Sequence, residues 1–300
     1  ELFEDWMQDQ DPARIMSITG QPPSQMYTIA KLMWIRRNQP DLYRRMNRYA
    51  CFGDFLHVKM GLEPRTDHSM AARTMAFDIN ELRYSNEICN AADVDPALFS
   101  PAEPTGTPVG KLGPAAAEAM GLPPGCLVAT GSHDQPAGAL GCAVTEPGVT
   151  MDATGTVECF AAAQDEPVLN EIMLENSLQC YPAACPDTFV CLAFNFTGGS
   201  LLRWVRDHLG AAEKAAAKRS GRDVYDLLTE EMAEEPTDLF VLPHMMATGT
   251  PHMDPDPVGA VIGLSMGTTR GQLLRAVLEG ISYEMKLCQD CLERAGARLE

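Results

Sequence analysis

The chain has 300 residues, 45% hydrophobic and 21% charged, which is the composition of one large or two medium globular domains and excludes a disordered or fibrous protein. Its 23 basic and 41 acidic residues give a formal net charge of −18, which repels a phosphate backbone, so we expect no nucleic-acid partner. No apolar run reaches the roughly 18 residues that a membrane span needs, and acidic Glu1, Glu4 and Asp5 do not fit a secretory signal, so we expect a cytoplasmic protein without a membrane partner.

Helices dominate the elements predicted for the first third of the chain. Apolar residues at helical spacing, together with proline and glycine breaks, predict helices over residues 25–38, 40–48, 52–58, 81–91 and 114–120. The last of these helices ends at Gly121 and is followed by Pro123, Pro124 and Gly125. Such a cluster of chain-breaking residues is typical of a boundary, so we predict a mostly helical domain over residues 1–125.

Strands separated by glycine turns are predicted beyond residue 125. The pattern places them at residues 126–130, 148–152, 157–163, 178–181 and 189–196, with helices at residues 200–209, 224–234 and 270–295. This alternation predicts an α/β layer fold for a second domain over residues 126–300.

Asp134 is a candidate general base. It follows the predicted strand 126–130, and open α/β sheets bind ligands at the carboxyl ends of their strands. The alternative is that Asp134 caps the helix expected over residues 136–142. One carboxylate can do both.

Two glycine-containing segments are candidate anion sites. Thr154-Gly155-Thr156 forms a tight turn whose glycine lets backbone amides approach an anion and whose hydroxyls can donate to phosphate oxygens; the alternative is a plain β-hairpin. Gly199 stands in Thr197-Gly198-Gly199-Ser200, which leads into a helix and fits an anion-binding helix N-terminus or a simple capped start. Three such features in one domain are typical of an enzyme that binds a polyphosphate.

The remaining metal-ligating residues show no recognised pattern. His57, His68, His208, His244 and His252 have no ligand-like spacing, and Cys288 and Cys291 stand without a second pair, so the sequence does not indicate zinc. The ten cysteines are too sparse for a disulfide-stapled scaffold and are expected to be reduced.

Alternating Pro and Asp over residues 251–257 predict a rigid loop, with a calcium-like site as the alternative.

Two separated signatures, in order along the chain, resemble the FGGY family of carbohydrate kinases. Residues 26–38 contain Lys31-Leu32-Met33-Trp34, which is similar to the family's pattern of Lys, an apolar residue, any residue and Trp. Residues 259–264 and 272–279 form the second signature. Between them lie Asp67-His68-Ser69 with Thr74 and Asp78, residues 131–135, residues 153–156, and Leu242-Pro243 with Gly249, Pro251 and Asp254. The resemblance covers essentially the whole chain and is to ketose or xylulose kinase-like members.

The resemblance implies a ribonuclease H-like (actin-like ATPase) α/β fold and transfer of the γ-phosphoryl group of ATP to a hydroxyl of a ketose or polyol. It implies that Asp134 is the catalytic base and a magnesium ligand through water, and that Met26, His133 and Gln135 bind substrate. It also implies that Thr154, Gly155, Thr156 and Gly199 contact the ATP phosphates. Met26 stands where glycerol kinases have a tyrosine, which favours a ketose over glycerol.

Two family segments are absent from the sequence: the early Asp-x-Gly-Thr phosphate motif and the late glycine-rich adenosine loop. The chain therefore resembles an internal fragment, with residues 1–125 as the later part of the sugar-side domain and residues 126–300 as the first half of the nucleotide-side domain. We expect this piece alone to be inactive and, with apolar faces uncovered, to form a homo-oligomer. The alternatives are a non-catalytic sugar-binding or regulatory member and a chaperone-type ATPase of the same superfamily.

Overall fold

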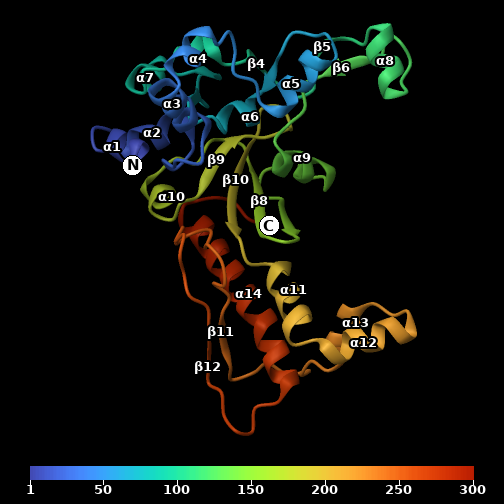
Figure 1. Ribbon diagram of the computed structural model, residues 1–300. Coiled ribbons are helices and arrows are strands. Elements are labelled where there is room, and N and C mark those ends of the chain that lie inside the picture. Colours follow the sequence, from blue (N-terminus) through green and yellow to red (C-terminus); the bar gives the residue numbers. More distant parts are fainter. The chain divides into compact units, whose positions relative to one another are not determined.

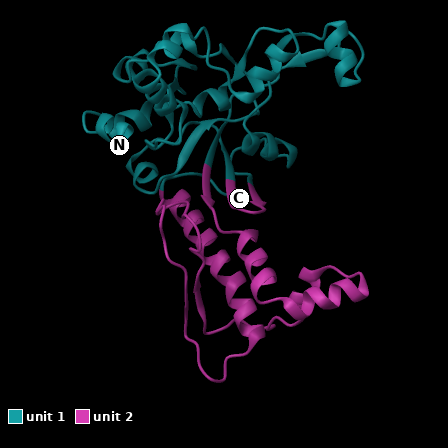
Figure 2. Cartoon of the chain, viewed as in Figure 1, with its two compact units in different colours: residues 1–150, 161–191, 295–300 teal, residues 151–160, 192–294 magenta.

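The computed structural model describes residues 1–300, which form two compact units (Figure 2). The first unit comprises residues 1–150, 161–191 and 295–300. The second comprises residues 151–160 and 192–294. No helix in the chain is both long enough and apolar enough to cross a bilayer.

Most of the regular elements of the first unit are helices (Figure 1). They are α1 Leu2–Met7, α2 Pro12–Thr19, α3 Thr28–Asn38, α4 Pro40–Arg45, α5 Phe52–Lys59, α6 His68–Ala72, α7 Asn86–Ala91, η1 Pro96–Leu98, α8 Pro114–Met120, α9 Asp134–Gly141 and α10 Glu171–Glu175. A core that includes Ile15, Ile29 and Leu32 holds α2 and α3 together, because their apolar residues recur on one face. The helices predicted around residues 25–38, 40–48, 52–58 and 114–120 are confirmed.

The start predicted for the helix at residues 81–91 is wrong. Arg83–Tyr84 form strand β3, which pairs antiparallel with β2, Phe77–Asp78. Leu82 has a φ of 50°, in the left-handed region that an α-helix cannot include. The helix α7 therefore begins only at Asn86, where the Ser85 hydroxyl caps it by accepting the N–H of Ile88.

Short two-stranded sheets complete the first unit. Strand β1, Thr66–Asp67, is parallel to β4, Ala102–Glu103, and β5, Pro108–Lys111, is antiparallel to β6, Leu127–Ala129. The strand predicted before Asp134 is therefore present as β6. However, it belongs to an antiparallel ribbon and not to an open parallel sheet, so the sheet-edge argument for Asp134 does not apply.

The largest sheet has the strand order β7-β8-β10-β9. Its strands are β7 Thr150–Thr154, β8 Glu158–Gln164, β9 Gln179–Pro182 and β10 Phe189–Asn195, close to the predicted ranges. All four residues of β9 are buried, and the polar one among them, Gln179, is paired with Arg73. With these strands the mixed α/β class is confirmed.

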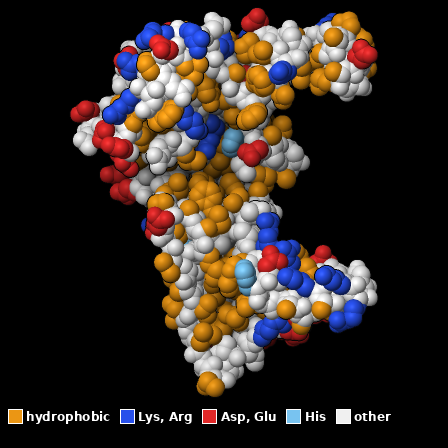
Figure 3. Space-filling model, in the orientation of Figure 1, with side chains coloured by type: hydrophobic (Ala, Val, Ile, Leu, Met, Phe, Trp, Pro, Cys, Tyr) orange, Lys and Arg blue, Asp and Glu red, His pale blue; other side chains and the backbone are white.

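The second unit is built around the long helix α14, Arg270–Arg294 (Figure 1). Its other elements are α11 Gly199–His208, α12 Ala211–Ser220, α13 Val224–Glu230, and the antiparallel strands β11 Phe240–Leu242 and β12 Ala260–Ile262. A Cβ at Gly280 would lie 2.4 Å from the carbonyl oxygen of Val241, so only glycine lets α14 approach β11 this closely. Hydrophobic side chains gather on the visible face of this unit (Figure 3), and Phe240 and Ile262 are among the exposed ones.

Candidate active site

Asp134 is the first residue of α9, and its carboxylate is open to solvent. The side chain is 81% exposed, and its Oδ1 accepts the N–H of Gln135 at 2.8 Å. The N-cap residue is His133, whose side chain makes no cap bond. Asp134 therefore stabilises the first turn of the helix and still presents a carboxylate to solvent, so capping and catalysis are compatible.

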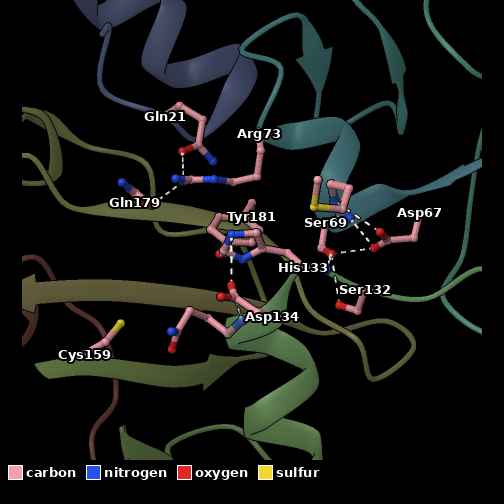
Figure 4. A network of polar contacts seen from close by, with 12 residues as sticks. Gln21, Asp67, Ser69, Arg73, Ser132, His133, Asp134, Cys159, Gln179 and Tyr181 are labelled. Atoms are coloured by element: carbon pink, nitrogen blue, oxygen red, sulfur yellow. Dashed lines mark hydrogen bonds and ion pairs between the residues drawn. The ribbon is translucent and has the colours of Figure 1, made fainter. Parts of the chain in front are cut away.

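His133 connects Asp134 to the interior of the first unit (Figure 4). Its Nε2 lies 3.2 Å from Oδ1 of Asp134, and its Nδ1 lies 3.0 Å from the hydroxyl of Tyr181. Burial, with a further contribution from the nearby charge of Arg73, lowers the pKa of His133 to about 4. The ring is therefore neutral near pH 7. With the proton on Nε2, it faces the carboxylate while Nδ1 accepts from Tyr181.

The loop before Asp134 is anchored by a buried carboxylate and a buried hydroxyl. Ser69 donates its hydroxyl proton to Asp67 and accepts the backbone N–H of His133 at 2.8 Å. The hydroxyl of Ser132 lies 3.0 Å from that of Ser69 and is the donor, since the proton of Ser69 goes to Asp67. Burial raises the pKa of Asp67, and hydrogen bonds led by Ser69 oppose that rise. These contacts, drawn in Figure 4, fix the backbone that carries His133.

Arg73 places a positive charge beside this network. Its guanidinium donates to the side-chain oxygens of Gln21 and Gln179 and lies over the rings of Tyr27 and Tyr181, at 5.1 and 5.7 Å from their centroids. Amide oxygens and aromatic faces orient the cation without neutralising it. A hydroxyl or an anionic group of a ligand can therefore still bind to it.

A cavity of about 590 Å³ lies in the first unit beside these residues. Its lining includes Met26, Lys31, Asp54, Asp67, Arg73 and His133. The fold thus brings two of the predicted substrate residues, Met26 and His133, to one cavity. Gln135 is not in its lining, and the Oε1 of Gln135 is buried without a hydrogen-bond partner. The cavity mixes charged, hydroxyl and apolar groups, which suits a small polyhydroxylated molecule.

The predicted phosphate turn lies between β7 and β8 in the second unit. Thr154, Gly155 and Thr156 are exposed there. The turn packs on the start of α11, where Gly199 donates its N–H to Gly155 at 2.7 Å. A Cβ at Gly199 would lie 2.6 Å from the carbonyl oxygen of Gly155, so the contact requires glycine. The two predicted anion segments are therefore neighbours within one unit.

The amides at the start of α11 already have partners within the chain. Gly198 and Ser200 donate their N–H groups to the carbonyl of Thr156, both at 3.2 Å. Gly198 is the N-cap and has no side chain to cap with. Because carbonyls of the turn satisfy these donors, the helix start by itself is not a ready anion site. Thr156 keeps an exposed hydroxyl available, whereas the hydroxyl of Thr154 faces Glu158 and opposes the rise that burial causes in the pKa of that carboxyl.

Arg73, like Tyr181, is a residue of this site that the sequence did not single out. Its side chain meets Gln179, 106 residues further along the chain. No local pattern distinguishes such an arginine from one on a solvated surface. Asp67 and Ser69, in contrast, stand in a segment that the family resemblance includes.

Family models match most of the chain. The model for the FGGY family of carbohydrate kinases, N-terminal domain, matches residues 1–141, and the model for the C-terminal domain of that family matches residues 153–300. A xylulose kinase of Klebsiella pneumoniae is 29% identical over 273 residues, which are 89% of this chain and 53% of the relative. A gluconokinase of Bacillus licheniformis is 26% identical, covering 94% of this chain and 56% of the relative. The chain spans about half the length of the curated relatives it matches.

Solved structures show the same fold. A structure described as a xyloylose kinase from Brucella ovis aligns with a TM-score of 0.83 at 23% identity, covering the whole of this chain and 59% of that one. Plasmodium falciparum glycerol kinase with ADP aligns with a TM-score of 0.82 at 16% identity, covering 99% of this chain and 58% of that one.

Proposed function

Because this chain belongs to the FGGY family of carbohydrate kinases, we propose that it supplies the catalytic base and one phosphate-binding turn of a kinase that transfers the γ-phosphoryl group of ATP to a hydroxyl of a ketose or polyol. The observation that most supports this is the exposed carboxylate of Asp134, held 3.2 Å from the neutral imidazole of His133, which lines the cavity. A general base needs both a fixed position and a carboxylate that the substrate hydroxyl can reach.

In this proposal Asp134 accepts the proton of the attacking hydroxyl. Proton acceptance by a positioned carboxylate contributes part of the rate, and phosphoryl transfer depends mainly on in-line positioning and charge neutralisation. His133, anchored through Ser69 and Tyr181, acts as a positioning residue for the carboxylate. Its neutral ring leaves the negative charge on Asp134 available for the proton.

The residues present fit ATP and magnesium. In the second unit an exposed turn offers the hydroxyl of Thr156, that of Thr154 could bind a phosphate by leaving Glu158, and Gly155 and Gly199 keep the backbone free of side chains there. In the first unit Asp134 offers a solvent-exposed carboxylate oxygen, which is the ligand type that Mg²⁺ binds directly or through water. When bound, magnesium supplies neutralisation of phosphate charge.

We propose Met26 and His133 as substrate-binding residues because both line the cavity, with Gln135 as a third residue next to the base. The named relatives act on xylulose, gluconate and glycerol, and the ketose assignment is supported by Met26 in place of a tyrosine. Because the cation of Arg73 lines the cavity and could bind a carboxylate, a sugar acid is also a candidate substrate.

The activity is proposed for a protein that joins this chain to the rest of the two family domains. Residues 1–125 would be the later part of the sugar-side domain and residues 126–300 the first half of the nucleotide-side domain. We expect the 300-residue chain alone to be catalytically inactive. When the protein holds only one side of the nucleotide, the effective molarity of the reacting groups becomes very low. Exposed apolar residues on the edge strands β11 and β12 support a homo-oligomer for this chain.

The test measures ADP release by a full-length protein containing this chain, with a panel of ketoses, polyols and sugar acids. Asp134→Asn should lower kcat by roughly 100-fold or more. Asp9→Asn, at an exposed aspartate outside the cavity, should leave kcat unchanged. Sugar binding without ADP release would favour the non-catalytic alternative. ADP release that does not depend on sugar would favour the chaperone-type ATPase.

A further inference from the structure

His244, His252 and Glu284 meet in the second unit although the sequence showed no metal-ligand spacing. One donor atom from each residue lies within 4.8 Å of the other two. His244 follows β11, His252 lies in the next loop, and Glu284 projects from the middle of α14. Three segments that are distant in sequence therefore converge on one point.

Two of these side chains already have the spacing of metal ligands. The Nε2 of His244 lies 3.3 Å from Oε1 of Glu284, and both side chains are largely buried, at 14% and 12% exposure. Two ligands bound tetrahedrally to one metal at about 2.0–2.1 Å each are separated by about 3.3 Å. The third ligand, His252, is exposed, so its ring can complete the set by a change of rotamer.

The imidazole of His244 is not fully satisfied by the protein. Its Nδ1 is buried and has no hydrogen-bond partner. Buried polar atoms are normally paired, so hydrogen bonding within the protein does not account for the buried position of this ring; the nitrogen with metal-ligand spacing is Nε2, and Nδ1 lies outside the proposed ligand set. The ring of His252 stands edge-on to that of His244, with centroids 5.8 Å apart, and supplies no hydrogen bond to it.

The loop that carries His252 is held in place independently of these three residues. Thr248 donates its N–H to the carbonyl of Asp254 at 2.9 Å, and Asp254 donates its N–H to the hydroxyl of Thr248 at 2.8 Å. Thr250 donates its N–H to the carbonyl of Phe194 at 2.8 Å, and its own carbonyl accepts from the thiol of Cys288 on α14. A loop closed on itself and tied to α14 presents His252 with little ordering cost on binding.

We propose that His244, His252 and Glu284 bind one divalent transition metal of the zinc class, which fastens the loop of residues 243–254 to helix α14. Two imidazoles and one carboxylate are a ligand set that Zn²⁺ takes, with water at the fourth position. Mg²⁺ and Ca²⁺ prefer oxygen ligands and are excluded by the two imidazoles. The net charge of −18 favours any cation at this surface.

The first experiment titrates the chelator-treated 300-residue chain with Zn²⁺ against a chromophoric chelator and follows its melting temperature. We expect one tightly bound Zn²⁺ per chain and a higher melting temperature, and no such effect of Mg²⁺ at the same concentration. Absence of stoichiometric binding by the unaltered chain would overturn the proposal.

Variants locate the ion. His252→Ala removes an exposed ligand and should keep the fold, which circular dichroism checks, while raising the Kd for Zn²⁺ at least tenfold; Glu284→Gln should do the same. His208→Ala, at an exposed histidine on α11 outside the cluster, is the matched control and should bind as the unaltered chain does. Unchanged affinity in both cluster variants would refute the site.

Cobalt distinguishes this site from the cysteines. Co²⁺ bound by nitrogen and oxygen ligands gives weak visible bands, whereas thiolate ligands add strong near-ultraviolet charge-transfer bands. We expect the weak bands alone, and their loss in His252→Ala. A thiolate spectrum would assign the metal to cysteines and contradict the proposal.

Discussion

The Nε2 atom of His133 lies 3.2 Å from the Oδ1 atom of Asp134, and the other nitrogen of the same ring faces the hydroxyl of Tyr181 at 3.0 Å. Each ring nitrogen therefore has its own partner. A single neutral tautomer, with the proton on Nε2, satisfies both contacts. The protonation state of this partly buried imidazole thus determines whether a neutral or a charged ring faces the carboxylate of Asp134.

The stability of the first unit should fall as the pH is lowered from 6.5 towards 4. The pKa of His133 is lowered to about 4 from an ordinary value of 6.5, so in this range the unfolded chain binds a proton that the folded chain does not. The loss should be on the order of 3 kcal/mol at most. Urea unfolding at several pH values measures it. His133→Gln should flatten the dependence, whereas exposed His208→Gln should leave it as it is; a slope unaffected by His133→Gln would contradict this assignment.

Ser69→Ala should destabilise the first unit by about 1–3 kcal/mol. The change deletes the hydroxyl that serves both the Asp67 carboxylate and the N–H of His133, and it leaves these groups buried without that partner. Chemical denaturation followed by fluorescence gives the value. Ser17→Ala removes a hydroxyl whose only role is to donate to Arg14 at 2.8 Å near the surface, so it should cost little. Equal effects of the two changes would argue against the anchor.

Gly199→Ala should separate the start of α11 from the turn at Gly155. The added methyl would lie 2.6 Å from a backbone carbonyl, which cannot move aside as a flexible side chain could. Overpacking of this kind costs about 1–3 kcal/mol. Calorimetry on the variant tests this, with Gly267→Ala as control because its methyl would meet no atom closer than 3.7 Å. A variant with the original melting temperature would show that the two segments can part freely.

Cys142 should be alkylated faster than Cys89 at pH 7.5. Cys142 is exposed, whereas Cys89 is buried and burial raises its pKa to about 12, so its reactive thiolate is scarce. Brief treatment with iodoacetamide followed by peptide mass spectrometry compares the two sites. In unfolded chains both should react alike, and rapid labelling of Cys89 in the folded chain would disprove its burial.

The local sequence was sufficient to predict the bounds of helices whose apolar periodicity ends at a chain-breaking residue. Gly121 has a φ of 66° and ends α8 where expected, and α14 extends over almost the whole predicted range. The start of the helix predicted at residue 81 was wrong, because Leu82 adopts a left-handed conformation and no glycine in the sequence indicates it. The local sequence located β6 but not its antiparallel partner β5, since which strand pairs with which is decided by packing and not by the strand's own sequence.

The residues of the candidate site likewise fall into those that a local motif predicts and those that only the fold brings together. Asp134 and Gly155 belong to short contiguous motifs, so their chemistry could be predicted from adjacent residues. The partners of Arg73 and the meeting of His244 with Glu284, 40 positions later in the sequence, depend on the fold as a whole. A residue pair of that kind has no signature in a single sequence.

The anchor of the candidate site also constrains the order in which the first unit can fold. Ser69 and His133 are 64 residues apart, and Arg73 and Gln179 are 106 apart, so each contact closes a long loop and loses chain entropy before it stabilises anything. Helices such as α3 form from neighbouring residues and can precede them. A collapsed intermediate with native helices would therefore lack this network, and protection of the His133 amide from hydrogen exchange would appear only with the final condensation of the unit.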